Sequence, residues 1–298
     1  MDAAVLENSV GEWVLGVIGG SGLYDIPGLK DARWIDQDTP WGPPSDQILT
    51  GVLGELKLAF LPRHGRGHKL SPTDVNARAN IAALKQIGCT DILSLSAVGS
   101  LKEELPPGTF CIVDQFIDRT FARDKSFFGP GLVAHVSMAH PVCPRLSALA
   151  AEAAREAGAS VVEGGTYLAM EGPQFSTRAE SELYRSWGCS VIGMTNMPEA
   201  KLAREAELPY ASVSMVTDYD CWHEDIAHVE VAQIVACLMD NAAKARDLVV
   251  RLSAKLQGSR APSPIDTGLD DAIITQPAAR DPAMVEKLKV IAGRALSA

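Results

Sequence analysis

Three short segments carry side chains suited to holding a tetrahedral anion. Residues 19–22 (GGSG) combine glycines, which let the backbone approach an anion closely, with the hydroxyl of Ser21. Arg63 and His64 begin a basic, glycine-containing run, and a guanidinium group binds phosphate oxygens in pairs. Residues 96–100 (SAVGS) form a second small-residue turn with hydroxyls. Together these types predict a phosphate site, with ordinary tight turns and a solvated loop as the alternatives.

Several better-known sites do not match the sequence. No G-K-[ST] follows the first glycine turn, and Asp25 stands where a dinucleotide fingerprint needs its third glycine, which disfavours a nicotinamide-dependent oxidoreductase. His64 and His68 have the spacing of a metal pair on a helix, but the glycines between them oppose a helix. The six cysteines are scattered without a C-x-x-C pair, so we expect reduced thiols and no metal site.

Two carboxylates follow the last predicted strand. Asp218 and Asp220 are two residues apart, so in extended chain they project in the same direction. Neighbouring like charges raise the pKa of one partner, which would let one of the two act as an acid near neutral pH. An exposed acidic loop or a helix N-cap is the alternative. Cys221 beside His223 has the types of a nucleophile pair, although a scattered cysteine is usually structural.

A fourth segment, residues 170–178 (MEGPQFSTR), lies between a predicted strand and a predicted helix. Its Glu and Gln side chains can bind sugar hydroxyls, and Phe175 offers a face for a flat ring. The alternative is a helix entry, because Thr177 and Glu180 have the spacing of a capping box. Both interpretations can hold together.

Alternating strand and helix patterns position these segments. We predict strands over 14–20, 48–53, 56–62, 91–100, 109–118, 160–170, 190–195 and 210–217. We predict helices over 74–88, 144–159, 177–188, 198–208, about 228–252 and 282–297. This alternation predicts an α/β fold, with a central mixed, largely parallel sheet flanked by helices. Ligands of such sheets bind beyond the carboxyl ends of the strands, where the segments above fall.

Length, charge and hydropathy indicate which broad class of protein this is. The chain has 298 residues and a formal net charge of −10, which leaves no basic footprint for nucleic acid or an anionic membrane. Its start lacks the features of a secretory signal, and no apolar run approaches the roughly 18 residues of a membrane span. We therefore expect a soluble, cytoplasmic protein with one domain over 1–298: a core over about 12–256, a loop over 257–281 and a C-terminal helix over 282–297.

Taken in order, six motifs resemble a known family. They are IGGSGL (18–23), RHG (63–65), SAVGSL (96–101), MEGPQFSTRAES (170–181), GMTNMPEAKLAREAELPYA (193–211) and TDYDCW (217–222). The set is similar to the trimeric purine nucleoside phosphorylases, and within them to the branch that acts on S-methyl-5'-thioadenosine. The resemblance covers most of residues 14–252 and does not extend well over the last ~45 residues.

The resemblance implies a role for each matching position. The positions that match the phosphate site are Ser21, Arg63, His64, Ser96, Ala97 and Thr195. Met194 matches the residue packed against the ribose, and the purine positions are Phe175, Ser176, Asp218 and Asp220. The 5'-alkylthio positions are His135, Val231, Ile234 and Val235. The family uses phosphate as a cosubstrate, with no metal and no organic cofactor. It also implies a homotrimer with sites near subunit contacts, for which the helix over 282–297 is our candidate.

The implied reaction is reversible phosphorolysis of S-methyl-5'-thioadenosine to adenine and 5-methylthioribose 1-phosphate, in purine and methionine salvage. We expect Asp218 to protonate the leaving adenine at N7, and Asp220 to hold the 6-amino group or tune Asp218. A carboxylate accepts a hydrogen bond from a 6-amino purine, whereas a 6-oxo purine presents an acceptor there. Phosphorolysis of adenosine, 6-oxopurine nucleosides or methylthioinosine is the alternative activity, and a non-catalytic nucleoside-binding protein is the alternative class.

Overall fold

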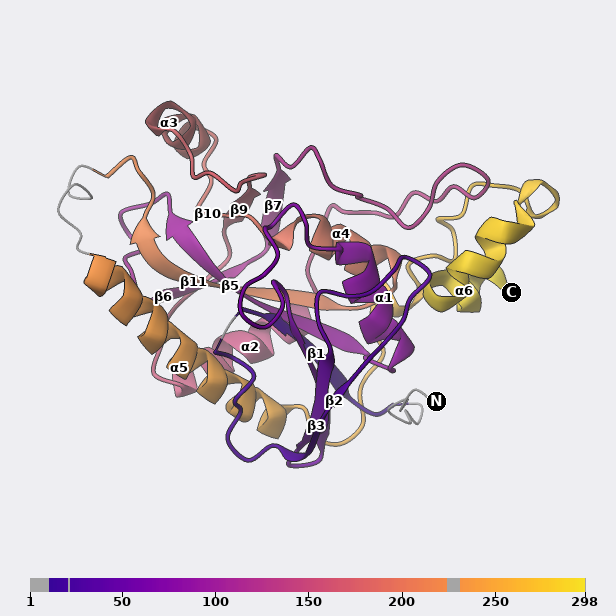
Figure 1. The fold of residues 1–298 in the computed structure, drawn as a ribbon, viewed down its shortest axis with the longest axis horizontal. Coiled ribbons are helices and arrows are strands. Elements are labelled where there is room, and N and C mark those ends of the chain that lie inside the picture. Colours follow the sequence, from indigo (N-terminus) through magenta and orange to yellow (C-terminus); the bar gives the residue numbers. More distant parts are fainter. Residues whose placement is uncertain (1–10, 21, 224–230, 298) are drawn as a thin grey trace.

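A computed structural model describes residues 11–20, 22–223 and 231–297, without the side chains of 231–235. The described residues form one sheet of eleven strands (Figure 1). In chain order the strands are β1 (Val14–Gly19), β2 (Lys30–Ile35), β3 (Ile48–Leu53), β4 (Leu56–Pro62), β5 (Asp91–Ser100), β6 (Thr109–Val113), β7 (Gln115–Asp118), β8 (Ser160–Glu163), β9 (Thr166–Ala169), β10 (Val191–Gly193) and β11 (Tyr210–Tyr219).

The sheet is mixed and mostly parallel, as predicted. Its main path runs β2-β3-β4-β1-β5-β10-β9-β7, while β11 pairs with β5 and β6, and β6 pairs with β8. β4, β1, β5 and β11 are parallel to one another, so their carboxyl ends reach the same edge of the sheet. Antiparallel pairs join β2 to β3, β3 to β4, β5 to β10 and β6 to β11.

Helices cover both faces of this sheet. They are α1 (Ala77–Gln86), α2 (Pro144–Glu156), α3 (Arg178–Ser186), α4 (Asn196–Glu205), α5 (Val231–Lys255) and α6 (Pro282–Leu296). α1, α4 and α6 share one buried hydrophobic cluster, whereas α2 and α5 share a second cluster on the other face. In Figure 1, α2 and α5 accordingly lie on the opposite side of the sheet from α1 and α6.

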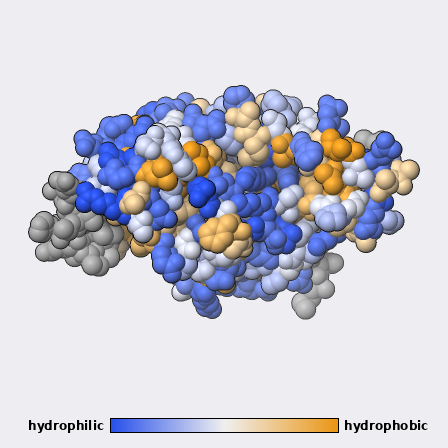
Figure 2. Space-filling view, turned by 90° about the horizontal axis from the view of Figure 1, so that it is seen from above, coloured by the Kyte–Doolittle hydropathy of each residue, from blue (hydrophilic) through white to orange (hydrophobic). Residues whose placement is uncertain are grey.

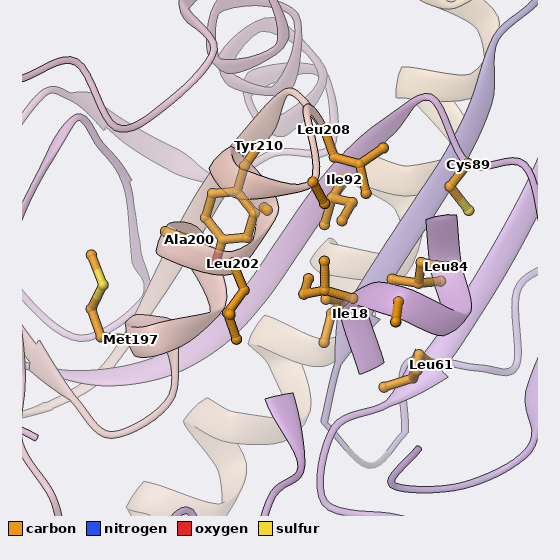
Figure 3. Close-up of a cluster of buried hydrophobic side chains, with 14 of the residues drawn as sticks. Ile18, Leu61, Leu84, Cys89, Ile92, Met197, Ala200, Leu202, Leu208 and Tyr210 are labelled. Atoms are coloured by element: carbon orange, nitrogen blue, oxygen red, sulfur yellow. The ribbon is translucent and has the colours of Figure 1, made fainter. Parts of the chain in front are cut away.

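Successive side chains of a strand point to opposite faces of the sheet, so one strand contributes to both clusters. In β1, Val14 and Ile18 belong to the first cluster, and Leu15 and Val17 to the second. Figure 3 shows part of the first cluster, where side chains of β1, β4 and β5 meet those of α1 and α4. The described cysteines are all free and four of them are buried, which confirms the prediction of reduced thiols. Within the described ranges, no helix is long and apolar enough to span a bilayer.

Three sequence predictions of elements were wrong. The strand expected over 109–118 breaks at Asp114 into β6 and β7, which pair with different neighbours. The strand expected over 160–170 breaks at residues 164–165, two glycines with positive φ of 82° and 134°, a conformation that favours glycine. β2 was missed because its residues are mostly exposed and lack an apolar alternation. Residues 257–281 contain two short 3-10 segments, Pro264–Thr267 and Pro277–Ala279, and α6 follows as expected.

Candidate active site

The central strand β5 has an opening along one of its edges. β1 pairs with this edge as far as Ser94, and β10 pairs with it from Gly99 onward. Within the described ranges, no strand pairs with this edge of the four residues between them, while β11 pairs with the same residues along the opposite edge of β5. Ala97 is exposed here, in a strand that is otherwise almost entirely buried. The fork between β1 and β10 therefore leaves β5 backbone open to a ligand at the carboxyl edge of the sheet.

Two hydroxyls predicted to bind phosphate meet at this opening. Ser96 lies on β5, and Thr195 lies where β10 leads into α4. Their side-chain oxygens share a hydrogen bond of 3.1 Å. Ser21, the third hydroxyl of the prediction, lies outside the described residues. The structure thus brings together two of the three expected hydroxyls.

Arg63 reaches the same opening but is not a free cation. Its Nε donates to Glu199 over 2.9 Å, its Nη2 to Ser94 over 2.7 Å, and its Nη1 to the Leu95 carbonyl over 3.0 Å. Burial alone would lower the pKa of Arg63, but Glu199 raises it on balance, so the guanidinium stays protonated. One N–H of Nη1 has no acceptor in the described part of the chain. Glu199 was missed from sequence because one acidic residue early in a helix is typical of a solvent-exposed face.

His64 lies beside Arg63 in a neutral form. Its Nδ1 is 3.0 Å from the Leu70 carbonyl, which can only accept, so Nδ1 carries the proton. Burial, and then the charge of Arg63, lower the pKa of His64 to about 4. Its ring stacks on His68 with centroids 4.4 Å apart. In the described ranges no three metal-ligating side chains lie together.

The two carboxylates of the sequence prediction come together at the end of β11. The pairing of β11 with β5 shifts between Val216 and Asp218, so that Asp218 is opposite Gly99. A Cβ added at Gly99 would lie 3.3 Å from Asp218 Oδ1 and 3.5 Å from Asp220 Cβ. The missing side chain of Gly99 therefore provides the space in which both acids sit.

Burial raises the pKa of both acids. For Asp218 the charge of Asp220 adds to this rise, while a 2.7 Å hydrogen bond from the Thr217 hydroxyl opposes it. Asp220 is 9% exposed, and the nearby Ser181 hydroxyl and Cys221 backbone N–H oppose the rise of its pKa. No group in the described ranges meets hydrogen-bond geometry with its Oδ2. A buried carboxylate oxygen without a donor favours protonation or a ligand with an N–H group.

Groups outside the sheet stabilise the register shift between β11 and β5. The Val216 carbonyl accepts from Asn241 Nδ2 and from the Gly108 backbone N–H, each over 2.9 Å. Asn241 is fully buried on α5. Sequence reasoning missed this residue, because a lone Asn within a long helix carries no signal of what it contacts.

Segment 170–177 borders the two acids. Phe175 is 83% exposed, and the Cys221 thiol donates to the Ser176 carbonyl over 3.3 Å, next to Asp220. The predicted capping box at the start of α3 is confirmed, since Thr177 and Glu180 each bond the other's backbone N–H. In Figure 2, hydrophobic residues on the face seen from above gather in separate patches on a largely hydrophilic surface.

Of the four expected alkylthio residues, His135 is the one whose side chain the structure describes. His135 is exposed, and its backbone N–H donates to the Ala272 carbonyl. In Figure 1 the segment after β7 runs beside the C-terminal segment near α6, whereas β11 ends on the other side of the molecule. Val231, Ile234 and Val235 begin α5, and their side chains lie outside the described residues.

Comparison with known proteins shows the family of the chain. A family model for the phosphorylase superfamily matches residues 14–254. The chain belongs to this superfamily. It is 64% identical over 285 residues to S-methyl-5'-thioadenosine phosphorylase of Cereibacter sphaeroides, covering 95% of this chain and 98% of the relative. Identity to the Rhodospirillum rubrum protein of the same name is 63%, with 95% and 97% covered. Within the superfamily, the chain groups with the S-methyl-5'-thioadenosine phosphorylases.

Solved structures of phosphorylases support the fold. A methylthioadenosine phosphorylase from an antarctic soil metagenomic library superposes with a TM-score of 0.90 at 44% identity, covering 94% of this chain and 99% of that one. Methylthioadenosine phosphorylase of Schistosoma mansoni, in complex with tubercidin, gives 0.76 at 36% identity, covering 82% and 92%. The α/β architecture with a mixed sheet is therefore that of this superfamily.

Proposed function

We propose that the chain catalyses reversible phosphorolysis of S-methyl-5'-thioadenosine, yielding adenine and 5-methylthioribose 1-phosphate. The observation that carries the proposal is the juxtaposition of two groups of side chains along β5. Ser96 and Thr195 lie at the opening in its edge, and Asp218 and Asp220 lie around Gly99 at its end. The relatives named above support the choice of substrate.

Phosphate would bind at the opening in β5. The hydroxyls of Ser96 and Thr195, the free Nη1–H of Arg63 and β5 backbone supply donors for its oxygens. Because Glu199 neutralises Arg63, the bound phosphate keeps most of its negative charge. That charge stabilises the oxocarbenium-like sugar as the glycosidic bond stretches, and a phosphate oxygen then bonds to C1'.

The leaving adenine needs a proton as its bond to C1' breaks. Asp218, whose pKa is raised by burial, donates this proton to N7. The phosphate loses its own proton on becoming the sugar ester, so the net transfer runs from phosphate to adenine. Asp220 accepts from the 6-amino group, which would give its unpartnered Oδ2 a donor. Both products are suited to purine and methionine salvage in the cytoplasm.

A homotrimer is part of the proposal. His135 is exposed, and the segment that carries it runs beside the C-terminal segment, whereas β11 ends on the other side of the molecule, so we assign it to a nucleoside site across a subunit contact. The nearby helix α6 is our candidate for that contact. Light scattering of the purified protein should give three times the mass of the chain, and a monomer that is fully active would refute this part.

Release of free base from methylthioadenosine, methylthioinosine, adenosine and inosine, with and without phosphate, tests the reaction. We expect adenine fastest from methylthioadenosine and no release without phosphate. Faster release from the 6-oxo substrates would refute the role of the two acids in choosing the base. No release from any substrate would refute the enzymatic function.

Substitution of the proposed acid tests the mechanism. Asp218→Asn should lower kcat by roughly 10²- to 10⁴-fold, the usual range for loss of a general acid. The control is Asp247→Asn, whose carboxylate is 43% exposed and pairs with Arg251 on α5. Near-normal turnover in Asp218→Asn would contradict the assigned role.

A further inference from the structure

A buried arginine outside the residues discussed so far joins several segments around the site. Each of the five N–H groups of Arg123 has an acceptor. Nη1 donates to the carbonyls of Met194 over 2.5 Å and Met197 over 2.8 Å. Nη2 donates to the carbonyls of Glu171 over 2.6 Å and Met170 over 3.5 Å, and Nε donates to Glu171 Oε1 over 3.0 Å. One side chain thus binds the ends of both β9 and β10.

Glu171 completes the connection from the other side. Its carboxylate accepts from the Thr73 hydroxyl over 2.5 Å and from the backbone N–H groups of Phe121 and Ala122 over 2.6 and 3.1 Å. The side chains of Arg123 and Glu171 are 5% and 8% exposed. Burial tends to raise the pKa of Glu171, but the hydrogen bonds outweigh it and lower the pKa to about 2. The Glu171 carboxylate is therefore ionised at neutral pH, and both its oxygens accept hydrogen bonds.

An independent feature shows how closely the two strand ends are held. Gly172 has a positive φ of 71°, and a Cβ added there would lie 2.5 Å from Met194 Sδ. A side chain at position 172 would adopt a strained backbone conformation and would require either the Met194 side chain or the segment that carries Phe175 to move. Gly172 thus allows the segment after β9 to lie close to Met194, at the place where Arg123 binds the carbonyls of both segments.

We propose that Arg123 and Glu171 act as a clamp that sets the spacing between the two ends of the nucleoside site. Met194 stands at the sugar end and segment 172–176 at the base end, an assignment that rests on the proposed function. The clamp holds the carbonyls of both ends, and among the described residues its hydrogen bonds reach no residue of β1, β4 or β5. At the sugar end it binds Met194, the neighbour of the phosphate-site residue Thr195. Arg123 and Glu171 are positioning residues, since neither needs to touch the substrate.

Because the clamp fixes a distance, its loss should affect ligands according to their length. Adenine occupies the base end alone, whereas methylthioadenosine spans both ends. Arg123→Lys keeps the charge but offers at most three donors without the planar fork, so it cannot serve all these acceptors. Glu171→Gln keeps the shape and removes the charge. Both variants should lose affinity for methylthioadenosine at least tenfold, while adenine affinity stays within threefold.

The experiment is calorimetric titration of wild type and both variants with adenine and with methylthioadenosine, followed by steady-state kinetics. The matched control is Arg260→Lys, because Arg260 is 10% exposed and bridges Asp91 and Asp266 at the opposite end of β5. It should change neither ligand's affinity by more than threefold. Glu171→Gln, the milder change, supplies the result if Arg123→Lys does not fold.

Two outcomes would overturn the clamp. In the first, either folded variant binds methylthioadenosine within threefold of wild type. In the second, adenine and methylthioadenosine lose affinity equally, which would indicate general disruption of the site instead of altered spacing. Failure of the proposed function is distinguishable from both, because wild type itself would then not bind or turn over methylthioadenosine.

Discussion

Replacing Glu199 by Gln tests how the phosphate end of the site is built. The Glu199 side chain is 4% exposed and accepts from Arg63 Nε, Ser94 Oγ and Tyr210 OH over 2.9, 2.7 and 2.7 Å. Gln keeps the shape but has one acceptor oxygen, and its NH₂ group would face donors. The guanidinium of Arg63 would then remain buried without a countercharge.

The size of the effect follows from that burial. Removing one partner of a buried ion pair lowers the free energy of unfolding by about 3–5 kcal/mol. For a protein of this length, 1 kcal/mol corresponds to a shift in Tm of roughly 1.5–2 °C, so we expect Tm to fall by roughly 5–10 °C. The matched control is Glu163→Gln, because Glu163 is 52% exposed in its pair with Arg155. Such surface pairs contribute at most about 1 kcal/mol.

Thermal unfolding in phosphate-free buffer near pH 7.5 measures this difference, and repeating it with phosphate adds a second test. Bound phosphate would supply the missing negative charge beside Arg63, so it should raise Tm more in Glu199→Gln than in wild type. A Tm for Glu199→Gln within 2 °C of Glu163→Gln would refute the stabilising role of the pair. An equal phosphate effect in variant and wild type would refute the placement of Arg63 at the phosphate site.

Two further predictions concern the space around Asp218 and the titration of Glu205. Gly99→Ala places a Cβ 3.3 Å from Asp218 Oδ1 and 3.2 Å from Ile192 Cγ2, so we expect a loss of kcat with little change in Tm, and unchanged kcat would contradict it. Burial raises the pKa of Glu205 from 4.5 to about 7, so the native state binds more protons than the unfolded chain between these pH values. The free energy of unfolding should therefore fall by up to about 3 kcal/mol as pH rises through this window. Glu205→Gln should flatten the profile of Tm against pH there, and an unaltered slope would rule out this cause.

Much of the fold could be predicted from the sequence, because its signals are local. Apolar runs of strand length, the amphipathic stretch of α1 and the capping box at Thr177 each depend on residues close together in the chain. The wrong predictions have a common origin. Asp114 and residues 164–165 interrupt the apolar runs only slightly. Whether the strand ends there depends on which neighbouring strand each half pairs with.

The candidate site, like the fold, was predictable where its signals are local in the sequence. Residue types at strand ends pointed to Ser96, Asp218 and Asp220, since parallel strands bring their carboxyl ends to one edge of the sheet, whereas Thr195 came from the family resemblance. The prediction of convergence at this edge needed only the order of elements. Hydroxyls and carboxylates at such positions restrict the chemistry to anion binding and proton transfer even before distances are known.

Only the tertiary structure decided how these side chains are charged and held. The sequence by itself made Arg63 a cation for phosphate, but the fold brings Glu199, 136 residues away, into contact with it and neutralises it. It likewise brings Arg123 to the ends of β9 and β10. Charge compensation and spacing depend on contacts between residues far apart in the chain. A linear pattern therefore names the groups that do chemistry, and the packing of the sheet sets their state and distance.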